Sequence, residues 1–302
     1  MEGVRMDGYS RRAFVGRTAA FLAGSAAGGK GILSALDVKS TADKQGVAPA
    51  GKPGGVPFRL GLASYTFREF SLEETLAMTV RLGLKRITFK DFHLPLQSSD
   101  EDIKLTVTKV RAAGLELYAG GVIYMKLPED VQNAFRYARA AGMDIIIGVP
   151  EHDLLPLVEQ KVKATGIKVA IHNHGPTDPV YPTPESAYER IKHLDGRIGL
   201  CLDIGHTQRA DTDPSLSAER FADRLLDVHI KDVTSADREG GTVEIGRGVI
   251  DIPKFLRTLI RIGYDGTASF EFEKDGKDPL PGVAESVGFI RGCLSAIGVG
   301  PL

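Results

Sequence analysis

After an atypical N-terminal region, short apolar runs alternate with longer stretches in which apolar residues recur at helical spacing. Residues 71–82 predict a helix that Ser71 caps, with Glu74 three residues later, and residues 252–262 predict a helix that ends at Gly263. Eight runs have the length and composition of strands: residues 58–66, 86–92, 116–124, 144–149, 168–173, 198–204, 225–231 and 268–273.

Eight strand–helix units within about 245 residues have the size and rhythm of a (β/α)8 TIM barrel, an α/β fold. An open doubly wound sheet is the alternative. However, no Gly-rich phosphate turn follows the first strand, where such a sheet commonly carries one. We therefore predict a single barrel domain over residues 56–302, preceded by a signal and flexible linker in residues 1–55.

Alternation within the predicted strands separates an outer face from an inner face. Side chains of a barrel strand point alternately toward the covering helices and into the interior, so the apolar parity marks the outside. Polar residues of the opposite parity lie toward the carboxyl ends of the strands, where barrel active sites are built. The inward set comprises Thr88, Lys90, His172, His174, Cys201, Asp203, Asp227, His229, Lys231, Glu271 and Glu273.

Four of the inward residues predict a divalent metal site. His172, Asp203, His229 and Glu271 come from consecutive strands and offer two imidazole nitrogens and two carboxylate oxygens. Buried ionisable groups are costly unless they are paired or bind a cation. This mixture of ligands suits Mn, Co, Zn or Fe better than Ca, and Mg fits it less well. Glu273, which has the same parity, is the alternative to Glu271.

Three further residues are candidates for substrate contacts. Lys90 would hydrogen-bond a substrate oxygen or neutralise developing charge, unless it pairs with the carboxylates. His206 would bind a substrate hydroxyl above the metal, or simply lie at the rim. Arg247, in the long loop after the seventh strand, would clamp a phosphate or remain a solvated loop residue.

The charge balance and the N-terminal segment narrow the range of partners. Lys and Arg total 38 against 39 Asp and Glu, so no global positive field holds a nucleic acid. Two cysteines cannot form a disulfide framework. Residues 10–16 resemble a twin-arginine export signal, with Arg11 and Arg12 before a short, weakly apolar run, although a basic disordered tail is the alternative. We expect a periplasmic or secreted protein without a stable membrane anchor.

Motifs in the second half of the chain resemble the xylose-isomerase-like barrel superfamily, in particular its sugar phosphate isomerase/epimerase-like branch. The resemblance covers roughly residues 58–298. It rests on Cys201-Leu-Asp-Ile-Gly-His-Thr, Val228-His-Ile-Lys-Asp, Gly246-Arg-Gly-Val-Ile-Asp and Gly263-Tyr-Asp-Gly-Thr-Ala-Ser-Phe-Glu.

In that family a Glu, an Asp, a His and a Glu on strands five to eight hold a metal. The resemblance implies that Asp203, His229 and Glu271 are ligands and that Lys231 contacts substrate, unless it pairs with Asp227. Strand five departs from the pattern, because His172 stands in His-Asn-His where many relatives carry Glu-Asn-His. One carboxylate of the family's acid–base pair is thereby lost.

The predicted site suits proton abstraction next to a carbonyl. A divalent ion that chelates the carbonyl and a neighbouring hydroxyl stabilises an enediolate. Glu271, Glu273 or an imidazole such as His174 would then take the proton. Return of the proton gives isomerisation or epimerisation, whereas loss of a β-substituent gives dehydration or lyase chemistry. Export favours a non-phosphorylated substrate, so we hypothesise a keto-sugar isomerase/epimerase or a lyase acting on 3-keto-glycosides.

Two other classes compete with this hypothesis. An AP-endonuclease-like repair enzyme needs more metal ligands and a basic groove, and the charge balance opposes it. A non-catalytic periplasmic sugar-binding barrel remains open. The expected partner is a small carbohydrate, and the sequence leaves open whether the protein forms a homo-oligomer.

Overall fold

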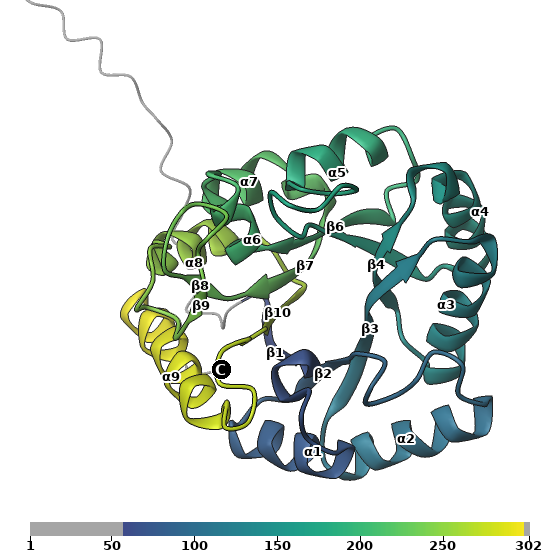
Figure 1. Ribbon diagram of the computed structural model, residues 1–302, viewed down its shortest axis with the longest axis horizontal. Coiled ribbons are helices and arrows are strands. Elements are labelled where there is room, and N and C mark those ends of the chain that lie inside the picture. Colours follow the sequence, from purple (N-terminus) through teal and green to yellow (C-terminus); the bar gives the residue numbers. More distant parts are fainter. Residues whose placement is uncertain (1–56, 299–302) are drawn as a thin grey trace, which may run out of the picture. The chain divides into compact units, whose positions relative to one another are not determined.

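The computed structural model describes residues 57–298, and eight parallel strands close into a barrel (Figure 1). Around the barrel the order is β1-β10-β7-β6-β5-β4-β3-β2. Each strand falls on one of the eight predicted runs, so the (β/α)8 fold is confirmed. The strands are β1 (Arg59–Ala63), β2 (Arg86–Phe89), β3 (Glu116–Met125), β4 (Ile145–Pro150), β5 (Lys168–His172), β6 (Ile198–Asp203), β7 (Leu225–Ile230) and β10 (Thr267–Phe270).

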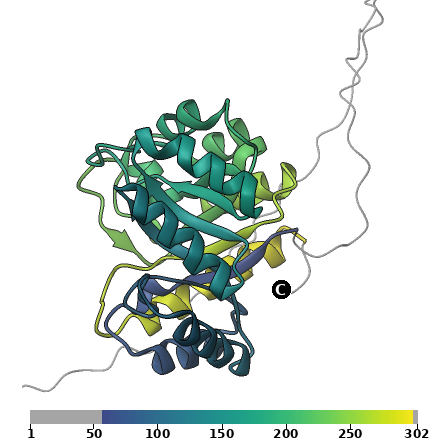
Figure 2. The same ribbon diagram turned by 90° about the vertical axis from the view of Figure 1, so that its right-hand side faces the viewer.

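Helices surround the barrel, and Figure 2 shows the same arrangement from the side. They are α1 (Leu72–Arg81), α2 (Asp100–Ala112), α3 (Pro128–Ala141), α4 (Leu155–Thr165), α5 (Pro184–Ile191), α6 (Ile204–Arg209), α7 (Pro214–Arg220), α8 (Ile252–Arg261) and α9 (Leu280–Ala296). A small antiparallel pair, β8 (Asp232–Val233) and β9 (Thr242–Val243), lies in the connection after β7.

The sequence signals for helix ends act as expected. At the start of α1, the Ser71 hydroxyl accepts a hydrogen bond from the Glu74 amide, and the Glu74 carboxylate accepts one from the Ser71 amide. Such a reciprocal cap contributes about 1 kcal/mol. Helix α8 ends before Gly263, whose φ of 69° lies in the left-handed region that favours glycine.

The register between neighbouring strands arranges the inward polar residues in layers across the barrel. Asp203 on β6 is paired with His229 on β7, and His229 with Ser269 on β10. Two residues earlier on β6 and β7, Cys201 is paired with Asp227, and Cys201 is also paired with His172 on β5. The barrel interior therefore carries polar side chains in adjacent layers.

The predicted signal and linker, residues 1–55, lie outside the described residues. Within residues 57–298, no helix has both the length and the apolar character needed to cross a membrane.

Candidate metal centre

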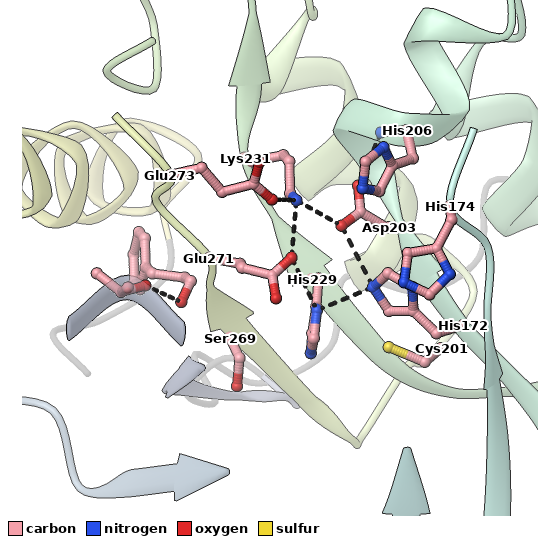
Figure 3. Close-up of polar contacts among 12 residues, drawn as sticks. His172, His174, Cys201, Asp203, His206, His229, Lys231, Ser269, Glu271 and Glu273 are labelled. Atoms are coloured by element: carbon pink, nitrogen blue, oxygen red, sulfur yellow. Dashed lines mark hydrogen bonds and ion pairs between the residues drawn. The ribbon is translucent and has the colours of Figure 1, made fainter. Parts of the chain in front are cut away.

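Four side chains predicted as metal ligands converge at the carboxyl end of the barrel (Figure 3). The His172 Nε2 atom lies 3.2 Å from His229 Nδ1 and 3.4 Å from Asp203 Oδ2. The His229 Nδ1 atom lies 3.4 Å from Glu271 Oε2. One ligand atom from each of the four lies within 4.8 Å of the other three, and all four residues are buried.

The spacing and chemistry of these atoms fit a divalent cation. A tetrahedral zinc ion with bonds of 2.0–2.2 Å holds its ligand atoms about 3.3–3.6 Å apart. The separations here are close to that range. A ligating imidazole must be neutral, and burial lowers the pKa of His172 to about 4. Because the set combines two nitrogens with two carboxylates, it would take a borderline ion such as Zn more readily than Ca.

Lys231 forms ion pairs with the carboxylates of the candidate site. Its Nζ atom lies 2.6 Å from Glu273 Oε1, 2.7 Å from Glu271 Oε2 and 3.0 Å from Asp203 Oδ2. Burial would lower the pKa of Lys231, but these carboxylates raise it well above its usual value. Burial would likewise raise the pKa of Glu271, yet Lys231 and His229 hold it well below the usual range. Lys231 therefore pairs with three carboxylates, none of which is Asp227, the partner considered from sequence.

A cavity of about 350 Å³ opens beside the four ligands. His174 lies on one wall, stacked on Tyr124 with ring centroids 5.5 Å apart, and burial lowers its pKa to about 3. The residues lining this cavity are Tyr65, Lys90, Val122, Tyr124, His172, His174, His206, Glu271 and Glu273.

Two of the predicted substrate residues line this cavity. The Lys90 Nζ atom donates a hydrogen bond of 2.5 Å to the Val122 carbonyl, and burial lowers the Lys90 pKa. The His206 ring centroid is 6.0 Å from that of His172 and 5.7 Å from that of His174. The His206 amide donates to Asp203 Oδ1, so Asp203 caps the N-terminus of α6, and this contact ties the helix to a candidate ligand.

Arg247 is not brought to the cavity. Its guanidinium forms a two-pronged ion pair with Glu285 on α9, at 2.6 and 2.8 Å, and its side chain is 61% exposed. The buried Asp232 carboxylate explains the placement, because it accepts hydrogen bonds from the amides of Gly246 and Gly248 on either side of Arg247. The predicted phosphate clamp therefore finds no support in the structure.

A layer of buried polar side chains lies beneath the four ligands, and the sequence analysis assigned no function to it. The Cys201 thiol and the Tyr118 hydroxyl lie 3.4 and 3.5 Å from Asp227 Oδ2, and Tyr118 also contacts Ser269 Oγ at 2.8 Å. Burial raises the pKa of Asp227 to about 7. Parity placed Cys201 and Asp227 inside the barrel but did not show which groups they would touch. The thiol also lies close enough to His172 and His229 to complete a second set of three ligand atoms.

Two curated proteins are similar in sequence to part of this chain. A rhizopine catabolism protein, MocC, from Rhizobium meliloti is 31% identical over 138 residues, which are 40% of this chain and 42% of that protein. An inosose dehydratase from Lacticaseibacillus casei is 27% identical over 130 residues, 38% of this chain and 43% of the dehydratase. The matches thus span less than half the length of these curated relatives.

A crystal structure of the IolI protein with a bound zinc atom superposes with a TM-score of 0.67 at 18% identity, covering 79% of this chain and 99% of IolI. The model of the xylose isomerase-like TIM barrel family matches residues 129–293, which include all four candidate ligands. This chain therefore belongs to the xylose isomerase-like TIM barrel family.

Proposed function

We propose that this protein is a divalent-metal-dependent sugar isomerase or epimerase that removes the proton next to a carbonyl of a non-phosphorylated keto-sugar. The observation that carries the proposal is the convergence of His172, Asp203, His229 and Glu271 beside a cavity of about 350 Å³. Relatives named as an inosose dehydratase and a rhizopine catabolism protein support sugar-related chemistry, and the zinc atom bound by IolI supports a metal.

His172, Asp203, His229 and Glu271 would hold the ion, which when bound supplies electrostatic stabilisation for negative charge on the sugar oxygens. The proton transfers then belong to the cavity walls. Glu273 and His174 lie on either side of the ligand cluster (Figure 3). The Glu273 carboxylate, 32% exposed and held by Lys231, takes the proton from carbon. His174 faces the other side, where a neutral imidazole can accept or relay a proton.

Two residues of the cavity would orient the sugar. Lys90 lies on the cavity wall with its Nζ atom over the Tyr124 ring, 5.4 Å from the ring centroid. Its remaining N–H groups would donate to a carbonyl or hydroxyl oxygen of the sugar. His206 would bind a hydroxyl near Asp203, since its amide is tied to that carboxylate. Positioning of this kind lowers the entropic cost of the proton transfer.

The charges around the cavity favour a substrate without phosphate. Among the described residues that line it, Lys90 is the one cation, whereas Glu271 and Glu273 are carboxylates. A dianionic phosphate in this space would face both carboxylates, and Arg247 is committed to Glu285 elsewhere. Phosphate-binding sites usually offer arginine or a helix N-terminus. A neutral keto-sugar avoids the repulsion.

A neighbouring cavity favours a second candidate, a lyase that eliminates from a 3-keto-glycoside on the same site. This space of about 330 Å³ shares Lys90, Val122 and Tyr124 with the first cavity. Its other walls combine apolar residues such as Phe89 of β2 and Leu94 with the polar Asp91 and Gln97 of the loop after β2. A free monosaccharide needs no second cavity, whereas the group attached to a glycoside would occupy it.

Incubation of zinc- or manganese-loaded protein with keto-sugars and 3-keto-glycosides in deuterated water tests the proposed function. Mass spectrometry and NMR would follow deuterium at the carbon beside the carbonyl. Exchange with an epimer or isomer as product supports the first candidate, and exchange with loss of the substituent supports the second. Tight sugar binding without exchange in any compound would show instead a non-catalytic binding barrel.

We also propose, from the sequence signal in residues 10–16, that the protein is exported by the twin-arginine pathway. Fractionation of cells that express the full chain would test this. The wild type is expected in the periplasm or medium, and the variant with Arg11→Lys and Arg12→Lys is expected to stay in the cytoplasm. Equal distribution of the two would contradict the proposal.

A further inference from the structure

Asp227 is a fully buried carboxyl group in the polar layer beneath the candidate metal ligands. It lies on β7, two residues before His229, and is 0% exposed. Its Oδ2 atom faces the Cys201 thiol and the Tyr118 hydroxyl, which are weak or distant donors at 3.4 and 3.5 Å. Its Oδ1 atom has no hydrogen-bond partner among the described residues. A buried carboxyl with so little compensation is costly and calls for a function.

The second observation is an unpartnered nitrogen that faces this carboxyl. The Nδ1 atom of His229 points to His172 and Glu271, where the ion would bind. The Nε2 atom, on the other edge of the ring, has no hydrogen-bond partner among residues 57–298 and lies 3.7 Å from Asp227 Oδ2. The unpartnered nitrogen thus faces the Asp227 carboxyl through Oδ2, the oxygen that has only the two weak or distant donors.

The chemistry of imidazole connects the two observations. A neutral ring that offers the lone pair of Nδ1 to a cation carries its proton on Nε2. This N–H group needs an acceptor in a site that excludes water. Metal-binding histidines commonly donate their second ring proton to a carboxylate, which fixes the tautomer and the ring orientation.

We propose that Asp227 is a positioning residue that accepts the Nε2 proton of His229 and so presents Nδ1 to the metal ion. The proposal rests on the metal site of the proposed function. The present separation of 3.7 Å exceeds a hydrogen bond, and we expect a small shift of the ring or the carboxyl to close it when the cation binds. Tyr118, held by Ser269 at 2.8 Å, supports the carboxyl from the side away from the ion.

Zinc affinity, measured by competition with a chromophoric chelator, tests this role without any need for turnover. Asp227→Ala should weaken zinc binding by about 10–100-fold, the usual effect of losing such a partner. Asp227→Asn retains an acceptor oxygen without the charge and should fall between this variant and the wild type. Tyr118→Phe is the matched control, because it removes another contact of Asp227, the one at 3.5 Å, and Tyr118 belongs to neither set of candidate ligand atoms, so zinc affinity should stay within about threefold of the wild type.

A second readout follows the tautomer directly. In zinc-loaded wild type, nitrogen NMR of the His229 ring should show a protonated Nε2 and a metal-bound Nδ1. Zinc affinity of Asp227→Ala within about threefold of wild type would overturn the proposal, and so would an equal loss in Tyr118→Phe. If Asp227→Ala does not fold, two other results together overturn the proposal. Asp227→Asn would bind zinc as tightly as the wild type does, and the NMR spectrum of the wild type would show no proton on His229 Nε2. A wild type that binds no zinc contradicts the proposed function itself, which separates the two failures.

Discussion

The His172 Nε2 and His229 Nδ1 atoms lie 3.2 Å apart, and each also lies 3.4 Å from a carboxylate oxygen. Two ring nitrogens that face each other at this distance either share one proton or both bind a cation. Because burial lowers the pKa of His172 to about 4, this imidazole is neutral at physiological pH and has a lone pair to give. The arrangement therefore favours a cation between the two rings, with Asp203 and Glu271 completing the site.

Removal of one imidazole should abolish tight metal binding and the stability that comes with it. A ligand that binds only the folded protein at about 1,000 times its dissociation constant adds about 4 kcal/mol to the free energy of unfolding. We expect zinc to raise the urea midpoint of the wild type and to leave that of His229→Ala unchanged. Arg247→Gln, on the exposed pair with Glu285, should respond to zinc as the wild type does. A zinc-dependent midpoint in His229→Ala would contradict the assigned ligand set.

Glu273 should be required for proton transfer but not for metal binding. Its carboxylate lies in the cavity and outside the set of four converging ligands. Glu273→Gln keeps the shape and the hydrogen-bonding oxygen but is a far weaker base, so deuterium exchange should slow by about 10²–10⁴-fold. Zinc affinity should change by less than about tenfold. Loss of zinc binding on a par with His229→Ala would instead make Glu273 a ligand.

Lys231 should stabilise the metal-free protein strongly, because it is the cation that Asp203, Glu271 and Glu273 share. Removing one partner of a buried ion pair costs about 3–5 kcal/mol, since the remaining charge stays buried. Lys231→Met should therefore lower the free energy of unfolding by that order in urea titrations without metal. The matched variant Lys254→Met breaks an exposed pair with Asp213 and should cost less than about 1 kcal/mol. Similar losses in both variants would show that the Lys231 contacts contribute little.

The metal-free protein should lose stability as the pH falls from about 6.5 to 4. Burial lowers the pKa of His172 and of His206 to about 4 and that of His174 to about 3, while unfolded histidine titrates near 6.5. In this window the unfolded chain binds protons that the folded chain does not, so acid favours unfolding. His229 and Asp227 act in the opposite direction: carboxylates, Glu271 foremost, raise the pKa of His229 despite burial, and burial raises the pKa of Asp227 to about 7. The three lowered imidazoles together outweigh these two groups, so we expect a net loss of stability in acid.

The melting temperature between pH 6.5 and 4 measures this dependence. His206→Asn removes one of the three titrating rings and should flatten the curve, whereas wild type and variant should run parallel above pH 7. A wild-type curve that rises as the pH falls through this range would contradict the prediction, because proton uptake by Asp227 and His229 would then outweigh the three imidazoles.

The strand positions and the inward parity could be predicted from sequence because both depend on local alternation. Apolar positions such as Val169 and Ile171 identified the outer face of β5, so His172 had to point inward. The register that aligns Asp203 with His229 could not be predicted in this way, because the pairing of β6 with β7 shifts by one residue between Leu200 and Cys201. The identities of three converging ligands also matched motifs of the family, and His172 followed from parity alone.

Contacts that depend on side-chain direction in space could not be predicted. Arg247 lies in the same loop as the family motif, yet the amides that Asp232 holds turn its side chain toward Glu285. Parity placed Lys231 inside but could not show that it meets three carboxylates at once. The pairing of Asp227 with His229 Nε2 depends on the rotation of one ring, which no sequence pattern records.

Anomalous diffraction at the zinc absorption edge, on crystals of the full chain grown with zinc, tests the metal site most directly. We expect one strong peak about 2.0–2.2 Å from four atoms: His172 Nε2, Asp203 Oδ2, His229 Nδ1 and Glu271 Oε2. The absence of an anomalous peak between the two imidazoles would contradict the proposed metal site. An anomalous peak found only beside other residues would contradict it as well.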